Sequence, residues 1–496
     1  MSSTIAKVSS HLHTHAAAYV LALCMGILMV APYAYFAHGP AYRGIAMMGH
    51  DAEEHYLARM QEVYDGHPLL GNTFLPFKNI PYLSPGLGED LVAYAGMGVG
   101  LSATQINLVA KVVLPLIIFL FIYGLALELS GARLAALFAA LTGMLATVVM
   151  SGDSILGVIW GRPINPELSG VFLFGGLWLL YRMRANATWP AVLLLGVITG
   201  ASLYLSPYVW SFLGACMGLW FLYQFWLKHY SQSLRFFLAG VVALLLDIPF
   251  VLNSIASHSY PGYAAAAAAQ EILHSHAPVV GVWVVVLLVV SWFSKSLLGS
   301  EARTFFVLCS VSLAIVLNQQ VLTGVYVQPG HFHWYITKPF VGIVLALVLW
   351  KLLERFAPKI QLPVAAVVSI MLVATAVVAQ VNFYNRFDSV ATAAQAYAPL
   401  VDYLRSQPKQ VVYANPDISQ YLPIYTSADT PNNAYAKLYV APPGYLDAVA
   451  ALPQQLNAAA VQKLGITLVI KDQSDSWDVS HLKLVQTVDR FKIYVP

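Results

Sequence analysis

The chain has 496 residues, of which 59% are hydrophobic and only 10% are charged, against roughly 25% charged residues in soluble domains. This composition excludes an ordinary soluble protein and indicates a polytopic membrane protein. A net charge of +3 is too small for an electrostatic nucleic-acid surface, so we expect no nucleic-acid partner.

Apolar stretches long enough to cross a membrane recur along most of the chain. A spanning helix needs about 17–25 mainly apolar residues. The sequence offers eleven such stretches, at residues 16–37, 107–127, 132–150, 167–183, 189–205, 207–227, 236–253, 278–294, 303–320, 339–356 and 362–380. The first follows Lys7 but ends without a small-x-small cleavage site, so we expect an uncleaved first helix.

Basic residues gather in alternate connections between these stretches. With the N-terminus in the cytoplasm, the short inner connections contain Arg133, Arg182, Arg184, Lys228, Arg235, Lys295, Arg303, Lys351, Arg355 and Lys359. The opposite short connections contain only Arg162 and, at the edge of a span, Lys338. This asymmetry follows the positive-inside rule and predicts that the C-terminal segment and the long loop at residues 38–106 face outward.

The charge density divides the chain at residue 380. Residues 1–380 carry 17 basic and 14 acidic side chains, whereas residues 381–496 carry 9 of each. We therefore predict an all-α transmembrane domain of about 11 helices over 1–380 and a small soluble domain over 381–496. In the soluble part, short apolar strands at 410–414, 466–470 and 492–495 alternate with an Ala-rich helical segment at 445–464, which predicts an α/β domain.

The long outer loop begins with a cluster of ionisable residues. If residues 51–64 form an amphipathic helix along the membrane, Asp51, Glu54 and His55 share one face. A carboxylate there can act as a general base or a metal ligand. The alternative is a solvated helix start whose acids favour the positive end of the helix dipole.

The predicted connection at 151–166 carries Asp153, Arg162 and Asn165. The planar donor fork of an arginine suits a phosphate group, while an arginine that extends to lipid headgroups is the alternative. Asp153 is either an ion-pair partner of Arg162 or a second acid of the site.

The predicted connection at 321–338 ends with His331, His333 and Lys338 among aromatic residues. In an extended segment both imidazoles would face one side and form a possible metal pair. An aromatic belt at the membrane interface is the alternative explanation for this composition. Lys338 offers a second cation for an anionic lipid headgroup.

Asp247 lies inside the predicted span at 236–253. An ionisable residue within a span is costly, which makes it a candidate functional residue. The alternative is that Asp247 caps a helix kinked at Pro249 or hydrogen-bonds a neighbouring span.

The layout of the chain resembles the polyprenyl-phosphate-sugar glycosyltransferases of superfamily C, in particular bacterial protein mannosyltransferases and aminoarabinose transferase homologues. The resemblance rests on Asp51 with Tyr56 in the long loop, on residues 162–166 (Arg-Pro-Ile-Asn-Pro), and on residues 414–423 (Ala-Asn-Pro-Asp-Ile-Ser-Gln-Tyr-Leu-Pro). Many relatives carry two adjacent acids in the loop. This chain has His50-Asp51-Ala52-Glu53, so its second acid is displaced.

The resemblance implies an inverting enzyme in the bacterial inner membrane that transfers a sugar from a polyprenyl-phosphate donor to a hydroxyl of a glycan, lipid or protein on the periplasmic side. The resemblance makes Asp51 the general base and Arg162, His331 and Lys338 the residues that hold the lipid phosphate. Together with the residues singled out above, the candidate catalytic residues are Asp51, Glu54 and Asp153, and the candidate substrate-binding residues are Tyr56, Arg162, Asn165, His331, His333 and Lys338. No cofactor is required, and a divalent cation held by Asp51, Asp153 and His331 is an open alternative.

Three other functions remain open at this stage. A polysaccharide polymerase or ligase shares lipid-linked donors and outer loops with the glycosyltransferases. A transporter or flippase for lipid-linked sugars would place polar residues along several spans, whereas this chain concentrates them in the outer connections. A non-catalytic membrane subunit would turn over no lipid-linked sugar when purified alone.

Overall fold

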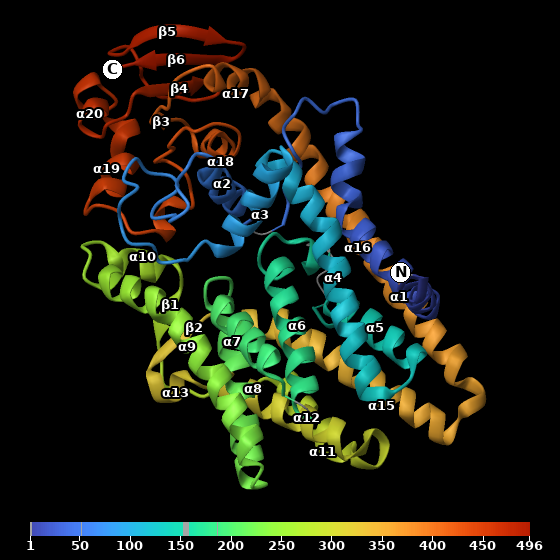
Figure 1. The fold of residues 1–496 in the computed structure, drawn as a ribbon. Helices are drawn as coiled ribbons and strands as arrows, with labels where there is room; N and C mark the ends of the chain where they lie inside the picture. Colours follow the sequence, from blue (N-terminus) through green and yellow to red (C-terminus); the bar gives the residue numbers. More distant parts are fainter. Residues whose placement is uncertain (1, 51, 152–157, 186) are drawn as a thin grey trace. The chain divides into compact units, whose positions relative to one another are not determined.

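The computed structural model describes residues 2–50, 52–151, 158–185 and 187–496 (Figure 1). Contacts divide the chain into two compact units. Unit 1 comprises residues 1–32, 109–247 and 274–385, and unit 2 comprises residues 33–108, 248–273 and 386–496. The predicted boundary at residue 380 stays a prediction.

All the apolar stretches predicted as spans lie on helices. These are α1 (Ser2–Ala37), α4 (Ala103–Ser130), α5 (Arg133–Ser151), α6 (Glu167–Met183), α7 (Trp189–Leu203), α8 (Pro207–Trp226), α9 (Tyr230–His258), α11 (Val282–Phe293), α12 (Lys295–Leu317), α15 (Lys338–Phe356) and α16 (Pro358–Ala394). Within the described part of the chain, seven helices are long and apolar enough to cross a membrane. The total of eleven spans stays a prediction.

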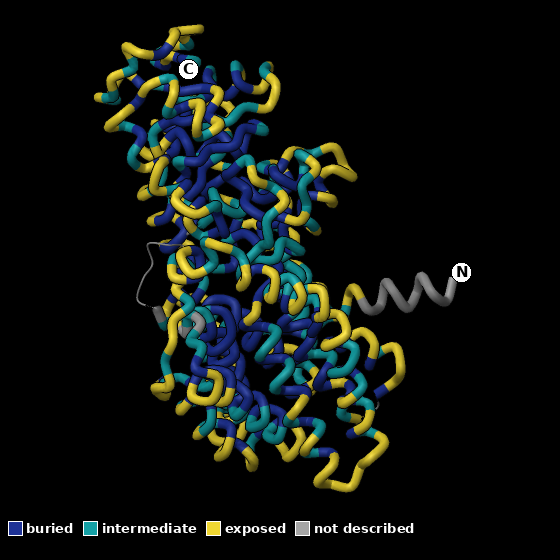
Figure 2. Tube along the Cα trace, turned by 90° about the vertical axis from the view of Figure 1, so that its left-hand side faces the viewer, coloured by how far each residue is buried: buried dark blue, intermediate teal, exposed yellow. Residues whose placement is uncertain are grey.

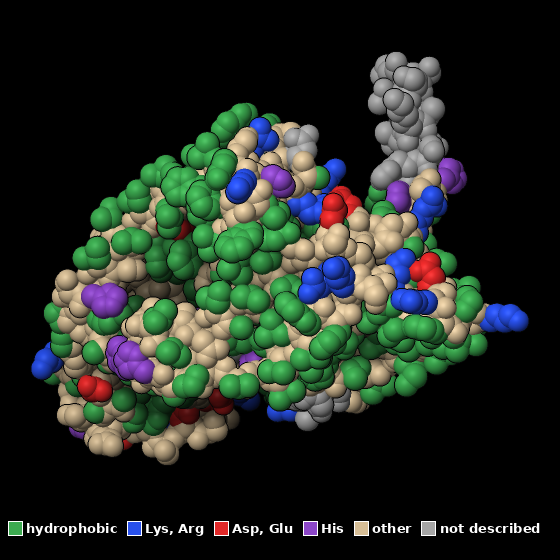
Figure 3. Space-filling view, turned by 90° about the horizontal axis from the view of Figure 1, so that it is seen from below, with side chains coloured by type: hydrophobic (Ala, Val, Ile, Leu, Met, Phe, Trp, Pro, Cys, Tyr) green, Lys and Arg blue, Asp and Glu red, His purple; other side chains and the backbone are tan. Residues whose placement is uncertain are grey.

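The outer faces of these helices are apolar, as a lipid environment requires. On α16, Val367, Ile370 and Met371 are exposed, while Ala376 and Ala379 on the opposite side are fully buried. Hydrophobic side chains also cover much of the face drawn in Figure 3. Contiguous exposed apolar surface on this scale indicates contact with lipid rather than with water.

Small residues allow close helix packing inside unit 1. Helix α15 packs along α5, where a Cβ added at Gly342 would lie only 2.8 Å from the carbonyl oxygen of Thr142. Glycine at such a position lets two helix backbones approach closely, which is how helices associate in membranes. The interior of the helical unit is correspondingly buried (Figure 2).

Unit 2 contains a four-stranded sheet in the order β3-β4-β6-β5, formed by β3 (Val412–Tyr413), β4 (Leu468–Asp472), β5 (Lys483–Val488) and β6 (Phe491–Val495). β3 is parallel to β4 with Val412 opposite Leu468, and β6 pairs antiparallel with both β4 and β5 (Figure 1). The three predicted strands are confirmed. The edge strand β5 is not predicted from the sequence, because its residues are mostly exposed and show no apolar alternation.

Helices connect and flank the strands of this sheet. Between β3 and β4 lie α18 (Pro416–Tyr425), η4 (Ala436–Leu438), α19 (Tyr445–Ala451), η5 (Leu452–Gln454) and α20 (Ala458–Lys463). The predicted Ala-rich helical segment corresponds to α19, η5 and α20. The tail is therefore a small sheet with intervening helices, and its periplasmic location stays a prediction.

The long loop after α1 folds together with the tail in unit 2. It contains α2 (Glu53–Tyr64) and α3 (Leu87–Val99), which pack on each other, and α2 also packs on α18. The predicted loop helix is thus confirmed from Glu53 onward. The remaining elements are η1 (Ile159–Gly161), α10 (Tyr263–Ala269), β1 (Ile272–His274), α13 (Gln320–Thr323), β2 (Val325–Val327), α14 (Pro329–Phe332), η2 (His333–Thr337), η3 (Gln395–Tyr397) and α17 (Ala398–Arg405).

Candidate functional site

The candidate base Asp51 lies outside the described residues, but its neighbours form a defined turn. The Glu53 N–H donates to the His50 carbonyl oxygen at 3.0 Å, which closes a turn from His50 to Glu53. Ala52 adopts the left-handed conformation, with φ 59°. This conformation is unfavourable for any L-residue that has a Cβ. The chain therefore enters α2 through a constrained turn.

The side chain of Glu53 accepts several hydrogen bonds in this turn. Its Oε2 accepts from the Tyr33 hydroxyl at 2.9 Å, from the Gly49 N–H at 3.0 Å and from the His50 N–H at 3.2 Å. Its Oε1 accepts from the Asn107 amide at 3.4 Å. Because Glu53 is fully buried, this carboxylate is part of the interior and not a solvated helix start.

The residues of α2 that follow Glu53 contact aromatic side chains of the C-terminal segment 386–496. His55 Nε2 lies 3.0 Å from the Tyr439 hydroxyl, and the His55 ring also contacts Tyr435, with centroids 5.1 Å apart. Glu54 contributes to the raised pKa of Tyr421, of which burial is the largest cause. Tyr56 is half-buried beside His55. The ionisable residues at the start of α2 therefore border an aromatic cluster of the same unit.

A buried ion pair holds this part of unit 2 together. Arg59 Nε lies 2.5 Å from Glu89 Oε1, and Arg59 Nη1 donates to the Tyr439 hydroxyl at 2.9 Å. Burial by itself lowers the pKa of Arg59, but the Glu89 charge and Tyr439 outweigh it and raise that pKa above its usual range. Burial raises the pKa of Tyr439 to about 12. Sequence reasoning missed this arginine because nothing local distinguishes it from a solvated helix residue.

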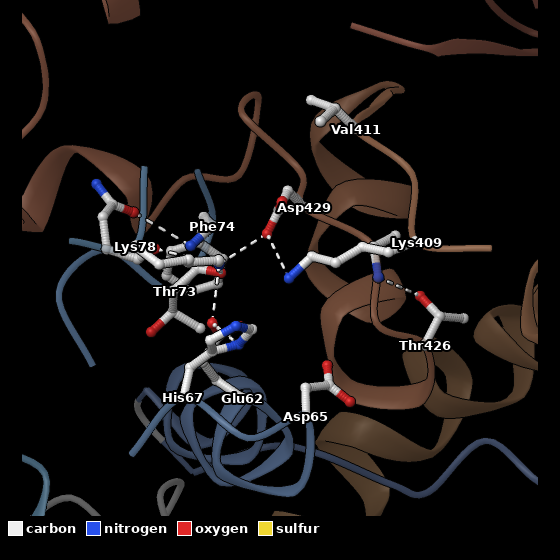
Figure 4. A network of polar contacts seen from close by, with 12 residues as sticks. Glu62, Asp65, His67, Thr73, Phe74, Lys78, Lys409, Val411, Thr426 and Asp429 are labelled. Atoms are coloured by element: carbon white, nitrogen blue, oxygen red, sulfur yellow. Dashed lines mark hydrogen bonds and ion pairs between the residues drawn. The ribbon is translucent and has the colours of Figure 1, made fainter. Parts of the chain in front are cut away.

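A second charged network connects the loop and the tail (Figure 4). Lys78 Nζ lies 2.9 Å from Glu62 Oε1 and 2.7 Å from Asp429 Oδ1. Lys409 and His67 complete the network, at 3.7 Å from Asp429 and 3.0 Å from Glu62. Burial raises the pKa of Glu62, and the nearby charge of Lys78 opposes that shift. These ion pairs fix the loop on the tail within unit 2.

Asp90, at the start of α3, is an acid with a strongly perturbed pKa. Burial, followed by the Glu89 charge, raises the pKa of Asp90 from 3.8 to about 7. Its Oδ1 is buried and has no hydrogen-bond partner among the residues that the structure describes. The folded-state pKa of Asp90 lies above the unfolded value. The stability linked to this group is therefore fully present below about pH 4, and it is lost as the pH rises through 7 and the buried carboxyl ionises.

We therefore expect Asp90→Asn to raise the midpoint of thermal unfolding at pH 8 and to change it little near pH 4. The measurement is a series of melts of the purified protein across this pH range. The matched control is Asp402→Asn, because Asp402 is an exposed acid of the same unit. An equal shift at every pH would contradict the raised pKa of Asp90.

In unit 1, Arg162 and His331 both contact the side chain of Tyr335. Arg162 Nη1 donates to the Tyr335 hydroxyl, and the Arg162 Cζ lies 5.8 Å from the centroid of that ring. The His331 ring contacts Tyr335 at 5.1 Å and stacks on Tyr208 at 4.9 Å. The Tyr208 hydroxyl in turn donates to Gln328 Oε1 at 2.8 Å. Two predicted substrate-binding residues thus belong to one cluster of aromatic and cationic side chains.

Buried polar groups anchor the turn that carries Arg162. Lys111 Nζ, on α4, donates to the carbonyl oxygen of Gly161, and Trp160 Nε1 donates to the Met144 carbonyl oxygen at 2.7 Å. Both side chains are fully buried. Sequence reasoning missed Lys111, although a lysine inside an apolar stretch is itself a signal of a functional or anchoring role.

The structure corrects the prediction of an extended segment at residues 331–333. Residues 329–337 are helical, as α14 followed by the π-helical turn η2. Positions i and i+2 of a helix point to different sides, so the two imidazoles do not share a face. His333 instead packs against Gly281, where an added Cβ would lie 2.4 Å from its ring.

The other predicted residues of unit 1 have separate partners. Lys338 Nζ lies 3.6 Å from the centroid of the Trp334 ring, and Asn165 Nδ2 donates to the Leu205 carbonyl oxygen at 2.9 Å. Asp247 accepts a hydrogen bond at 2.8 Å from Trp210 Nε1 on α8, which confirms the expected bond to a neighbouring helix.

The metal alternative depends mainly on residues that are not described. Asp51 and Asp153 lie outside the described residues, and His331 is packed between two tyrosine rings. Among the described residues, no group of three His, Cys, Asp or Glu is arranged to hold a metal ion.

Comparisons with known proteins identify the fold. No family model matches the chain, and no curated protein matches its sequence. Several solved structures are similar over most of the chain. ArnT from Cupriavidus metallidurans bound to undecaprenyl phosphate has a TM-score of 0.56 and 13% identity, covering 97% of this chain and 98% of that chain. The apo oligosaccharyltransferase of Archaeoglobus fulgidus has a TM-score of 0.55 and 11% identity, covering 92% of this chain and 69% of that chain. This chain therefore shares the fold of these two proteins, which agrees with the fold expected from the resemblance to superfamily C glycosyltransferases.

Proposed function

We propose that this chain is an integral-membrane glycosyltransferase that transfers a sugar from a polyprenyl-phosphate donor to an acceptor hydroxyl at the periplasmic face of a bacterial inner membrane. The observation that carries the proposal is the likeness over 97% of the chain to ArnT, whose structure contains undecaprenyl phosphate. The helices long and apolar enough to span a bilayer support a donor that is anchored in lipid.

The proposed reaction is a single displacement with inversion. The acceptor oxygen bonds to the anomeric carbon as the bond from that carbon to the phosphate oxygen breaks. Asp51 accepts the proton of the acceptor hydroxyl, and the leaving phosphate keeps the electron pair. Glu54 and Asp153 are the further carboxylates proposed for the site.

Cationic and hydrogen-bonding side chains stabilise the leaving phosphate in this proposal. Arg162 is the main candidate because guanidinium offers two parallel donors to phosphate oxygens. His331 supports it through the shared contact with Tyr335. Tyr56, Asn165, His333 and Lys338 keep their predicted substrate-binding roles. The reaction needs no metal in this form, and the divalent cation held by Asp51, Asp153 and His331 remains the alternative.

We expect Arg162→Lys to reduce transfer at least tenfold, because an ammonium cannot reproduce the bidentate geometry of a guanidinium. The measurement is the rate of transfer from a polyprenyl-phosphate sugar by purified protein. Tyr335→Phe is the companion variant, since it removes the hydroxyl that accepts from Arg162 and leaves the ring. Full activity of Arg162→Lys at normal stability would assign Arg162 to lipid headgroups.

The proposed orientation predicts which positions react with an impermeant thiol reagent. Single cysteines placed within 65–90, 321–330 and 381–496 are expected to react from the periplasmic side. A cysteine in the 228–235 connection serves as the control and is expected to react only after the membrane is opened. A tail that reacts only from the cytoplasm would contradict the topology and the location of the site.

A lipid-linked polysaccharide polymerase or ligase is the second candidate function. It is supported by the likeness in fold to the Archaeoglobus fulgidus oligosaccharyltransferase. Comparing a monosaccharide donor with an oligosaccharide donor on the same lipid distinguishes the two functions. Translocation of the lipid-linked sugar without transfer would indicate a flippase, and no turnover of any such donor would indicate a non-catalytic subunit.

A further inference from the structure

Glu53, the acid two residues after Asp51, has an unusual environment. Glu53 is fully buried, and among the described residues three donors converge on one of its oxygens, Oε2. A buried carboxylate is costly unless hydrogen bonds compensate the lost hydration. The number of donors therefore indicates that this side chain is built into the loop.

Two of these donors belong to the backbone just before Asp51. They are the N–H groups of Gly49 and His50, at 3.0 and 3.2 Å. The N–H of Glu53 itself returns to the His50 carbonyl oxygen, and Ala52 is held at φ 59°. Glu53 thus bonds the arm of the turn that precedes Asp51, through its carboxylate and its own N–H, in a turn that has to maintain the left-handed conformation of Ala52.

The other donors connect the turn to two long helices. Tyr33, near the end of α1, donates its hydroxyl to Oε2 and also stacks on the His50 ring, with centroids 6.4 Å apart. Asn107, near the start of α4, donates to Oε1 at 3.4 Å. All of these residues belong to unit 2. Glu53 therefore ties the loop to the ends of two apolar helices.

We propose that Glu53 is a positioning residue of the reaction, which ties the backbone before Asp51 to the start of α2 by accepting hydrogen bonds and takes no part in proton transfer or metal binding. The catalytic consequence of this inference rests on the proposed function, whereas the ordering of the loop does not. The two acids of the sequence Asp51-Ala52-Glu53 then have separate roles.

The chemistry of the contacts separates this role from the alternatives. A general base or a metal ligand needs the negative charge of Glu53. A positioning residue needs an acceptor oxygen where the three donors converge. Glutamine supplies that oxygen, and its amide group can face Asn107, whose own amide can turn to present its oxygen. Alanine supplies neither the acceptor oxygen nor the amide group.

The experiment compares Glu53→Gln, Glu53→Ala, Tyr33→Phe and the control Asp402→Ala, an exposed acid of the same unit. Transfer from a polyprenyl-phosphate sugar is measured across pH for each purified protein. We expect Glu53→Gln to keep turnover within about fivefold and Glu53→Ala to lose about 10–100-fold, with KM for the donor changed little, because misplacing a catalytic group lowers the rate rather than the binding. Tyr33→Phe is expected to fall between the two, and the pH dependence is expected to stay that of the wild type.

Hydrogen–deuterium exchange of residues 46–56 gives a readout that is independent of activity. We expect protection of the Gly49 and His50 amides to persist in Glu53→Gln and to be lost in Glu53→Ala. A loss of about 10²–10⁴-fold in Glu53→Gln with the exchange protected would overturn the proposal and assign Glu53 a charged catalytic role. Unchanged exchange in Glu53→Ala would also overturn it. If no variant, nor the wild type, transfers any lipid-linked sugar, the proposed function fails while the exchange result still decides the role of Glu53 in the loop.

Discussion

Replacing Asp51 by asparagine is expected to reduce glycosyl transfer by about 10²–10⁴-fold, the usual contribution of a general base. Asparagine keeps the size of the side chain but cannot take the proton from the acceptor hydroxyl. The loss should appear in turnover, because the proposed donor contacts involve other residues. The fold should be unaffected, since an acid that only favours a helix start contributes about 0.3–1 kcal/mol.

The measurement is transfer from a polyprenyl-phosphate sugar by the wild type and the variant, with the midpoint of thermal unfolding as the control for folding. Glu54→Gln is tested in parallel, because Glu54 is the next acid on α2 and its charge contributes to the raised pKa of Tyr421, after burial. Equal activities of Asp51→Asn and the wild type at equal stability would remove Asp51 from the mechanism. A large loss in Glu54→Gln alone would transfer the base to Glu54.

The helical part of the fold could be predicted because its signal is local. An apolar stretch of sufficient length forms a helix in a membrane whatever its neighbours are, since every backbone group has to be bonded within the segment. The helix starting at Glu53 and the three strands of the tail carried similar local patterns. The segment at residues 329–337 did not, because aromatic and histidine residues in alternation fit an extended chain and a short helix equally well.

The partners of the polar residues could not be predicted, because they depend on contacts between distant parts of the chain. Glu53 and Glu54 look alike in sequence, yet Glu53 is fully buried and accepts from four donors among the described residues, whereas Glu54 is half-buried. Lys78 in the loop meets Asp429 in the tail (Figure 4). The hydrophobic pattern of a helix reports which face is apolar, and it does not report which charge will be covered by another segment.

Replacing Arg59 by methionine is expected to destabilise the protein by about 3–5 kcal/mol, because it leaves the carboxylate of Glu89 buried without its partner. Arg59 is fully buried and also bonds Tyr439 and the carbonyl oxygen of Pro85, at 2.9 Å each. The loss is read from the midpoint of thermal unfolding of the purified protein. The matched control is Arg405→Met, since the Arg405–Asp402 pair is exposed at 3.6 Å and such pairs contribute about 0–1 kcal/mol.

A double variant distinguishes an unpaired charge from a simple packing defect. Without the guanidinium, the buried carboxylate of Glu89 loses its ion-pair partner, and an unpaired buried charge is costly. The double variant Arg59→Met with Glu89→Leu removes the uncompensated charge and is expected to regain part of the loss at neutral pH. A loss in Arg59→Met that persists undiminished in the double variant would show that the packing of Arg59, and not its charge, holds α2, α3 and the tail together.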